Sequence, residues 1–336
     1  MSFQAQKQLV RAHYAALEGA RPAAVANVLA ERTSDDWHWR GMHPFYEQHG
    51  AADVAASFWA PFLTAFSSVQ RREDIFFAGR NAQEGGPKAD WVVSMGHLMG
   101  LFDAPFLGIP PTRKIAMVRY VEFNRVEGGV ITETCLHVDL IHLMHQAGLR
   151  PLPPQTGAHL VQPGPRTHDG LLYEAQDPAE GAKTIEVIER MASRITAAGR
   201  KVDPQGELPH DWHQDMIWWG PDGIGATYTI DRYAEQHQAP FRNHLKDRTF
   251  NGHIARVGEG NYGGFFGWPN LTVTPTGGYM GLPADGKTPA DMRVVDIYRR
   301  DGDKLAENWV FIDILHFLSM QGLDVLGRMR EMRDPT

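Results

Sequence analysis

Hydrophobic positions along the first half of the chain follow two different periods. Residues 4–19 and 51–66 place apolar side chains three or four positions apart, which is the spacing of one helix face. Four later stretches have the composition and alternation of β-strands: 74–78, 90–98, 114–125 and 130–140. Gly-Gly pairs at 85–86 and 128–129 predict turns between them. The pattern therefore predicts two helices followed by a run of strands.

The second half of the chain repeats this order. A helix is predicted over 179–198, and residues 228–245 repeat the helical pattern of 51–66. Residues 293–323 then align without a gap with residues 119–149. A repeat of this length predicts two copies of one domain rather than a solenoid, whose repeats are about 20–50 residues long.

The two copies predict a division of the chain into three parts. We expect domain 1 over 1–152, a proline-rich linker over 153–174 and domain 2 over 175–336. Helices that precede a run of strands are typical of α+β domains. The sequence has neither βαβ alternation nor a Gly-x-Gly-x-x-Gly motif, which argues against a nucleotide-binding sheet.

Composition narrows the class of protein further. The net charge of -7 argues against a general nucleic-acid-binding surface, and no block of lysine or arginine suggests a membrane surface. A single cysteine, Cys135, excludes an internal disulfide and a cysteine-rich metal site. No run approaches the roughly 20 apolar residues that a membrane span needs, and the first residues lack the pattern of a signal peptide. We expect a cytoplasmic protein without nucleic-acid or membrane partners.

The repeated segment carries a recurring string, Gly-x-x-x-Glu-x-x-x-x-x-Asp, with Gly-Leu shortly after it. Its residues are Gly129, Glu133, Asp139 and Gly148-Leu149 in the first copy, and Glu307, Trp309, Asp313 and Gly322-Leu323 in the second. The string resembles the closing signature of the SnoaL-like polyketide cyclases, which belong to the NTF2-like superfamily. The family motif prefers tryptophan where Trp309 stands, and the first copy departs from it with Cys135.

The resemblance implies both a fold and an activity. The fold would be two tandem NTF2-like cone-shaped α+β barrels, each a curved antiparallel sheet wrapped around helices, that form a pseudo-dimer. In the family's cyclases the aspartate matching Asp139 and Asp313 is the acid/base of an intramolecular aldol closure, without a metal or cofactor. The activity implied is cofactor-independent acid/base catalysis, by aldol-type cyclisation or isomerisation, on a small hydrophobic carbonyl-containing ligand. The alternative is a non-catalytic module that binds a small hydrophobic ligand. Either function is compatible with a homo-oligomer.

Asp139 and Asp313 are the first candidates for catalysis. An apolar pocket would raise the pKa of either carboxyl, which suits proton transfer at carbon. The competing interpretation is that each aspartate caps the helical turn that follows it. Strand alternation places Cys135 and His137 on the face of Asp139, so His137 is a candidate catalytic partner. The second copy has Trp309 instead of Cys135, and we therefore expect the first copy to hold the more open site.

Two arginines and several aromatic residues complete the candidate site. Arg119 and Arg293 open the penultimate strand of each copy, where they would stabilise an enolate or, as we favour, pair with Glu133 and Glu307. Further candidates for substrate binding are Trp39, His97, Trp218 and Trp309. The histidines show no zincin-type spacing, so no metal site is predicted.

Overall fold

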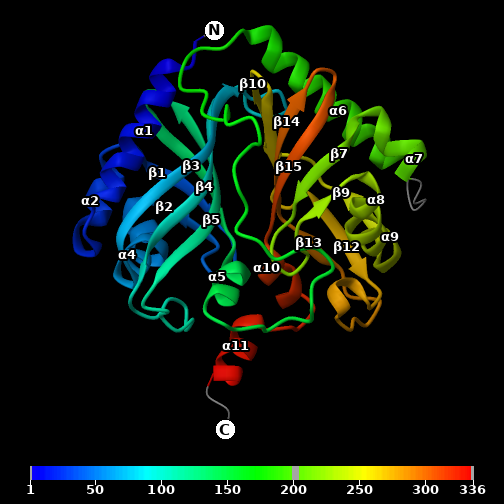
Figure 1. Ribbon diagram of the computed structural model, residues 1–336. Helices are drawn as coiled ribbons and strands as arrows, with labels where there is room; N and C mark the ends of the chain where they lie inside the picture. Colours follow the sequence, from blue (N-terminus) through cyan, green and yellow to red (C-terminus); the bar gives the residue numbers. More distant parts are fainter. Residues whose placement is uncertain (1, 199–203, 334–336) are drawn as a thin grey trace.

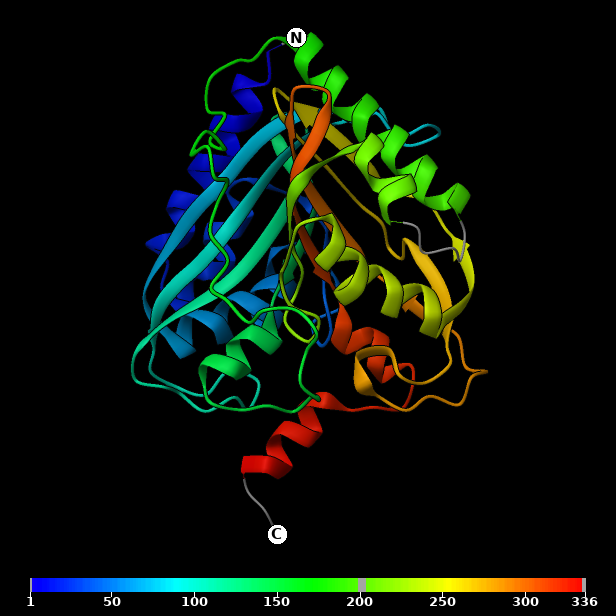
Figure 2. The same cartoon turned by 45° about the vertical axis from the view of Figure 1, so that its right-hand side comes forward.

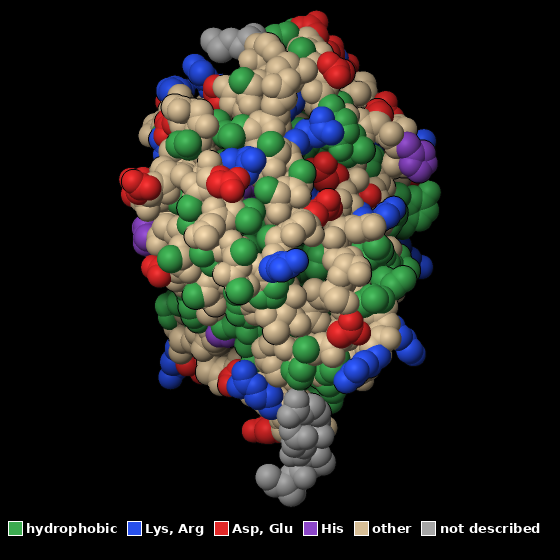
Figure 3. All heavy atoms as spheres, turned by 90° about the vertical axis from the view of Figure 1, so that its left-hand side faces the viewer, with side chains coloured by type: hydrophobic (Ala, Val, Ile, Leu, Met, Phe, Trp, Pro, Cys, Tyr) green, Lys and Arg blue, Asp and Glu red, His purple; other side chains and the backbone are tan. Residues whose placement is uncertain are grey.

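Two curved sheets face each other across the middle of the molecule, and helices cover their outer sides (Figure 1). The computed structural model describes residues 2–198 and 204–333. No described helix combines the length and the hydropathy needed to cross a membrane. The face in Figure 3 carries lysine and arginine side chains interspersed with aspartate and glutamate, so on this face charges of both signs are mixed.

The first domain begins with helices and ends with a six-stranded sheet. Its helices are α1 (Gln4–Glu18), α2 (Val25–Ala30), α3 (Gly50–Val54), α4 (Ala60–Ala65) and α5 (Leu140–Gln146). Its strands are β1 (Thr33–Gly41), β2 (Glu47–His49), β3 (Phe66–Arg80), β4 (Asp90–Phe102), β5 (Ile115–Glu127) and β6 (Val130–Val138). The helix predicted over 51–66 consists of α3, one π-helical turn (Ala55–Trp59) and α4.

The second domain repeats this plan. Its helices are α6 (Pro178–Ala198), α7 (Pro204–Glu207), α8 (Ile230–Tyr233), α9 (Ala239–His244), α10 (Ile314–Ser319) and α11 (Val325–Arg333). Its strands are β7 (Trp212–Trp219), β8 (Thr227–Tyr228), β9 (Leu245–Phe250), β10 (Ala255–Glu259), β11 (Tyr262–Phe266), β12 (Leu271–Pro275), β13 (Ala290–Met292), β14 (Val294–Asp301) and β15 (Lys304–Ile312). A π-helical turn (Ala234–Gln238) joins α8 to α9, as in the first copy.

The two main sheets have equivalent strand orders, β2-β1-β6-β5-β4-β3 and β10-β11-β14-β15-β7-β8. The sequence predicted antiparallel sheets, but each sheet contains one parallel pair, β1 with β6 and β15 with β7. The long β3 and β4 correspond to shorter strands in the second domain, where β9, β12 and β13 form a separate small sheet. Gly252, with a φ of 100°, and Pro269, which lacks an N–H, stand at the two interruptions.

Both copies carry a Trp-x-Gly motif at the end of the first strand of the domain, β1 or β7. Trp39 and Trp218 are buried inside their own domains, where Trp39 packs on Phe58 and Trp218 stacks on His237. A Cβ added at Gly41 would overlap the ring of Trp39, and one at Gly220 would overlap the ring of Trp218. Glycine is therefore needed for the tryptophan to fold back over its own strand.

The inner faces of the two sheets form a second hydrophobic core between the domains. Its members include Phe77, Trp91, Phe123, Cys135, Phe266, Ile297, Trp309 and Phe311, all buried. The residues inside the two domains belong to a hydrophobic cluster separate from this interface. That cluster includes Leu136 and Val138, which alternate along β6 with Cys135 and His137. The two domains therefore pack as a pseudo-dimer through their sheets.

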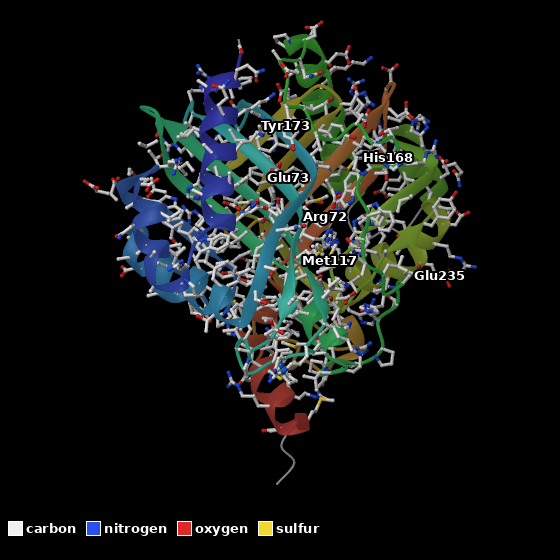
Figure 4. The ribbon with its side chains drawn as sticks, turned by 60° about the vertical axis from the view of Figure 1, so that its left-hand side comes forward. Arg72, Glu73, Met117, His168, Tyr173 and Glu235 are labelled. Atoms are coloured by element: carbon white, nitrogen blue, oxygen red, sulfur yellow. The ribbon has the colours of Figure 1, made fainter. Side chains whose placement is uncertain are left out.

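The segment between α5 and α6, residues 147–177, is an extended strap bonded to both domains (Figure 2). On the second domain, the Ala158 N–H donates to the Ala226 carbonyl at 2.8 Å. On the first, the Leu172 N–H donates to the Phe76 carbonyl at 2.8 Å, and the Tyr173 hydroxyl donates to Glu73 at 2.9 Å (Figure 4). The strap therefore holds the domains together as well as connecting them.

Candidate polar sites between the two domains

Asp139 and Asp313 each cap a helix and bind the other domain. Asp139 Oδ1 accepts the His142 N–H of α5 at 2.9 Å, and its Oδ2 accepts the Asp222 N–H of the second domain at 2.9 Å. Asp313 Oδ1 accepts the His316 N–H of α10 at 3.1 Å, and its Oδ2 accepts the His43 N–H of the first domain at 2.9 Å. The two aspartates thus occupy equivalent positions across a pseudo-twofold interface.

Both carboxyl groups lie out of water. Asp139 is 7% exposed and Asp313 is 0% exposed. Burial raises the pKa of Asp313 to about 6, because the charged form loses its hydration. Burial, together with the nearby negative charge of Asp222, raises the pKa of Asp139 to about 6.

The strand face that carries Cys135 and His137 points to the other domain, which corrects the predicted pair of His137 with Asp139. The His137 ring instead meets the Trp268 ring of the second domain, with their centroids 5.7 Å apart. Burial, with a smaller effect of the positive Arg293, lowers the pKa of His137 to about 3. Trp309 likewise fills the interface, where its Nε1 donates to the Pro163 carbonyl at 3.1 Å. Alternation separates two strand faces, but it does not say which of two cores each face joins.

The two arginines do not pair with the glutamates that the sequence suggested. Glu133 binds Arg40 at 2.9 Å, and Glu307 binds Arg299 at 2.6 Å. The register places Glu133 opposite Arg125 and Glu307 opposite Arg299, six residues along the strand from Arg119 and Arg293.

Arg119 and Arg293 differ in the acceptors that their guanidinium N–H groups find. Arg119 donates to the carbonyls of Val310 at 3.1 Å and Trp219 at 3.0 Å, and it stacks 3.9 Å above the Phe311 ring. Arg293 lies 4.3 Å above the Trp268 ring, and its Nη1 is 3.6 Å from Asp313 Oδ2. That Nη1 is buried and has no hydrogen-bond partner. The Nη1 of Arg293 therefore has no hydrogen-bond acceptor, whereas the Nη1 of Arg119 donates to a backbone carbonyl.

The Asp222 cluster, formed by His142, His145, His159 and Asp222, lies beside Asp139. Nδ1 of His145 and Nδ1 of His159 are each 2.8 Å from the same Asp222 oxygen. Asp222 is only 2% exposed. Burial acts to raise the pKa of its carboxyl, but the hydrogen bond from His145 and the charges of the neighbouring imidazoles together lower it. The cluster joins α5, the strap and the loop after β7.

The Asp222 cluster has the spacing of a metal site, but the tautomer of His142 does not suit metal binding. Ligand atoms of His142, His159 and Asp222 lie within 4.8 Å of one another. However, Gln146 is fixed by both backbone groups of Met117, at 2.9 Å each, so its amide N–H must face His142 Nδ1 at 3.1 Å. Nδ1 is then an acceptor and the proton is on Nε2, which leaves Nε2 without the lone pair that a metal needs. Within the cluster, the hydrogen-bonded clamp consists of His145, His159 and Asp222, whereas His142 Nε2 is buried without a hydrogen-bond partner.

The Arg293 cluster, formed by His43, Tyr46, Arg293 and His316, lies beside Asp313. The Tyr46 hydroxyl is 2.7 Å from His43 Nδ1, and the Tyr46 ring packs edge-on against His316. His316 Nδ1 is buried without a partner, as is Arg293 Nη1. Burial and the positive Arg293 lower the pKa of His316 to about 4, so its imidazole is neutral at pH 7.

The spaces beside the two clusters are unequal. A cavity of about 10 Å³ touches Asp139 and Asp222. A cavity of about 420 Å³ opens next to His43 on the other side. The larger cavity touches His43 but not Asp313, so the expected order of openness of the two sites stays a prediction.

The remaining predicted residues lie in separate places. Trp39 and Trp218 belong to the interiors of the two domains, and His97 is buried with its Nδ1 3.4 Å from Asp74. Sequence reasoning missed His43, Tyr46 and His316 as members of a site. The one available signal was the retention of histidine at both His142 and His316, since His43 and Tyr46 come from the other copy.

Comparisons with known proteins concern the fold. No protein-family model and no curated protein matches the chain. A proposed SnoaL-like polyketide cyclase from Jannaschia sp. CCS1 is similar at 19% identity and a TM-score of 0.36, over 46% of this chain and 95% of that chain. An NTF2-like protein from Burkholderia xenovorans LB400 is similar at 14% identity and a TM-score of 0.33, over 42% and 97%. A proposed polyketide cyclase from Streptomyces antibioticus is similar at 17% identity and a TM-score of 0.32, over 40% and 98%. The chain itself consists of two α+β domains in tandem with equivalent strand orders.

Proposed function

We propose that the protein is an acid/base enzyme that acts on a small carbonyl compound, without a cofactor, at the Arg293 cluster. The observation that supports this location is a pair of buried nitrogens without hydrogen-bond partners: Arg293 Nη1, which is 3.6 Å from Asp313 Oδ2, and His316 Nδ1. Unpaired buried polar atoms cost free energy, so a folded protein that keeps two of them together favours a ligand that satisfies them.

Each residue of the cluster has a role in this proposal. Arg293 Nη1 donates to the carbonyl oxygen and stabilises the enolate that develops there. His316 is neutral at pH 7 because burial and Arg293 lower its pKa to about 4, so it can accept a proton from the carbon next to the carbonyl. The His43 and Tyr46 pair, 2.7 Å apart, is placed to return a proton to the product.

Asp313 acts in this proposal as a positioning residue. Its Oδ2 fixes the His43 backbone at 2.9 Å and lies 3.6 Å from Arg293 Nη1. Asp313 therefore sets the distance between the two sides of the cluster, which come from different domains. Asp139 holds the Asp222 loop in the equivalent way and takes no part in the chemistry.

The alternative function is a module that binds a small hydrophobic ligand without chemistry. The observation that favours it is that both oxygens of Asp139 and both oxygens of Asp313 accept backbone N–H groups. The carboxylates that would serve as acid/base in a SnoaL-like cyclase are thereby committed to capping. The Arg293 cluster would then only hold a carbonyl oxygen.

Exchange of protons for deuterium separates the two functions. The full chain is incubated in D₂O with small aliphatic ketones, and deuterium at the carbon next to the carbonyl is followed by NMR. We expect catalysed exchange, and a loss of about 10²-fold or more in Arg293→Gln and in His316→Gln. The matched control is His213→Gln, whose imidazole bonds the Asp301 carbonyl far from the cluster. Ketone binding without any catalysed exchange would favour the binding module.

A further inference from the structure

Trp268, in the loop after β11, supports the guanidinium of Arg293. The Cζ atom of Arg293 lies 4.3 Å from the centroid of the Trp268 ring, and the Tyr46 ring lies farther away, at 5.9 Å. The face of an aromatic ring attracts a guanidinium, and tryptophan does so most strongly. The direction of the Arg293 N–H groups therefore depends on where the Trp268 ring stands.

Residues of the first domain hold the Trp268 ring. Its Nε1 donates to Glu47 Oε1 of β2 at 3.0 Å. Glu47 Oε2 lies 2.7 Å from His38 Nε2 and accepts Arg40 Nη1 at 3.3 Å, so the carboxylate is itself fixed on the β1–β2 hairpin. The His137 ring of β6 stands edge-on to the indole, with the centroids 5.7 Å apart. The tryptophan belongs to the second domain, but its neighbours in the first domain fix its position.

Arg293 Nη1 lies close to Asp313 without a normal hydrogen bond to it. Its distance to Asp313 Oδ2 is 3.6 Å, whereas a charge-assisted N–H···O bond is about 2.7–2.9 Å long. A guanidinium on a long, flexible side chain closes such a gap to a carboxylate unless another contact holds it back. The contact of Arg293 with the Trp268 ring is the one that can do so.

We infer that Glu47 and Trp268 are positioning residues for Arg293. Glu47 fixes the indole ring, and the ring keeps Arg293 Nη1 from closing on Asp313, so that the N–H stays available for an oxygen of a ligand. The use of this N–H for a carbonyl oxygen rests on the proposed function. The position of the guanidinium does not, and it can be measured without a substrate.

The first copy supports its equivalent arginine differently. Arg119 aligns with Arg293 and lies 3.9 Å above the Phe311 ring. Phenylalanine has no N–H group that another domain could hold, and two N–H groups of Arg119 donate to backbone carbonyls. The position that aligns with Phe311 is His137, whose ring meets Trp268. Trp268 therefore supplies beside Arg293 the ring that Phe311 supplies beside Arg119.

The NMR signal of the Arg293 Nε–H group tests the inference in the full chain. The protein carries isotope-labelled arginine, and the signal is identified by its loss in Arg293→Gln. The ring current of Trp268 shifts the signal, and Trp268→Leu gives its position without that ring. We expect Glu47→Ala to move the signal toward the Trp268→Leu position, and Glu47→Gln, which keeps an acceptor oxygen, to restore it. Trp91→Phe is the matched control, because Trp91 lies in the same interface but packs on Phe266, and it should leave the signal in place.

The rate of deuterium exchange in the same variants gives the second readout. We expect a loss of between about tenfold and 10²-fold in Glu47→Ala, mainly in kcat, and recovery in Glu47→Gln. Because 43% of the Glu47 side chain is exposed, its variants test the inference even where Trp268→Leu does not fold. An Arg293 signal that stays in place in Glu47→Ala would overturn the inference, and so would a displaced signal with an unchanged exchange rate. If the wild type catalyses no exchange, the proposed function fails, whereas the Arg293 signal still tests the positioning.

Discussion

A carboxylate that accepts two backbone N–H groups from two domains is held in place more firmly than a simple helix cap. Asp139 and Asp313 both have this geometry, so the same residue serves the fold of its own copy and the interface with the other. The difference between the two lies in their neighbours. Asp313 stands beside an arginine with an unused donor, whereas Asp139 stands beside one whose donors are engaged.

This difference predicts unequal effects of the same substitution. In Asp313→Asn the amide N–H₂ replaces either Oδ2, where it faces the His43 N–H and Arg293, or Oδ1, where it faces the His316 N–H. The resulting repulsion displaces members of the cluster. Because misplacement of catalytic groups by about 1 Å can cost about 10²-fold in rate, we expect deuterium exchange to fall by that order. Asp139→Asn should leave the exchange rate unchanged. Equal losses in the two variants would mean that both aspartates take part in the chemistry, or that the interface as a whole controls it.

His237 offers a test at the residue scale that does not depend on function. It replaces Phe58 of the first copy, stacks on Trp218 with centroids 3.9 Å apart, and leaves its Nδ1 buried without a partner. Burial lowers its pKa from 6.5 to about 3. Below pH 6.5 the unfolded chain binds a proton at His237, whereas the folded chain does not until the pH approaches 3. The contribution of His237 to the free energy of unfolding is therefore fully present above pH 6.5 and is lost as the pH falls toward 3.

His237→Phe should therefore stabilise the protein increasingly at low pH. Between pH 6 and pH 4 the free energy of unfolding of the variant should gain about 1.4 kcal/mol per pH unit relative to the wild type. Urea denaturation at several pH values measures this slope. His213→Phe, at a half-exposed position, is the control substitution. A pH-independent difference between His237→Phe and the wild type would show that His237 is protonated in the folded state.

At the scale of elements, periodicity predicted most helices and strands but not their interruptions. The helix over 51–66 contains a π-helical turn, and the strand predicted at 74–78 extends over the whole of β3, from Phe66 to Arg80. The second copy of β3 is broken into β9 and β10. Helical spacing is nearly the same for α- and π-turns over one turn, and polar residues in β3 hide its strand pattern, so a single sequence carries little information on either point.

The Trp-x-Gly motif gives an element-scale prediction. Gly41→Ala and Gly220→Ala each force a Cβ into a buried tryptophan ring that has no free space to move into. Overpacking of this kind costs about 1–3 kcal/mol or more, and each variant should lower the melting temperature clearly. Gly19→Ala is the matched control, because its nearest neighbour would be the Ala16 carbonyl at 3.9 Å. Melting temperatures unchanged by Gly41→Ala would mean that the Trp39 ring is free to turn away.

At the scale of the whole molecule, the sequence repeat predicted two domains but not how they meet. The alignment of 119–149 with 293–323 shows that both copies share a fold. The residues that fill the interface nevertheless differ between the copies: Cys135 aligns with Trp309, and His137 aligns with Phe311. A pseudo-twofold interface needs complementary rather than identical residues, since each position meets a different partner. The members of the Arg293 cluster come from both copies for the same reason, and no single-copy motif marks them.

One buried ion pair shows how far the strap and the two domains depend on one another. Lys7 of α1 is 2% exposed, and its Nζ donates to Glu259 of the second domain at 2.7 Å and to the strap carbonyl of Leu172 at 2.6 Å. The other Glu259 oxygen accepts the Ala78 N–H of the first domain at 2.7 Å. Two segments of the first domain, the strap and the second domain thus meet at a single pair of charges.

Removing Lys7 alone should cost more stability than removing both partners of this pair. Lys7→Met leaves Glu259 as a buried carboxylate without a counter-charge, and such losses cost about 3–5 kcal/mol. Glu259→Gln leaves the ammonium group with two carbonyl acceptors, so its cost should be smaller. The double variant has no unpaired buried charge, and we expect it to recover part of the stability lost in Lys7→Met. Urea denaturation of the four proteins gives the coupling energy as a double-mutant cycle. Additive losses would show that Lys7 and Glu259 act separately, and that the strap carbonyls alone hold the lysine; a coupling of more than about 1 kcal/mol would show that the pair itself joins the domains.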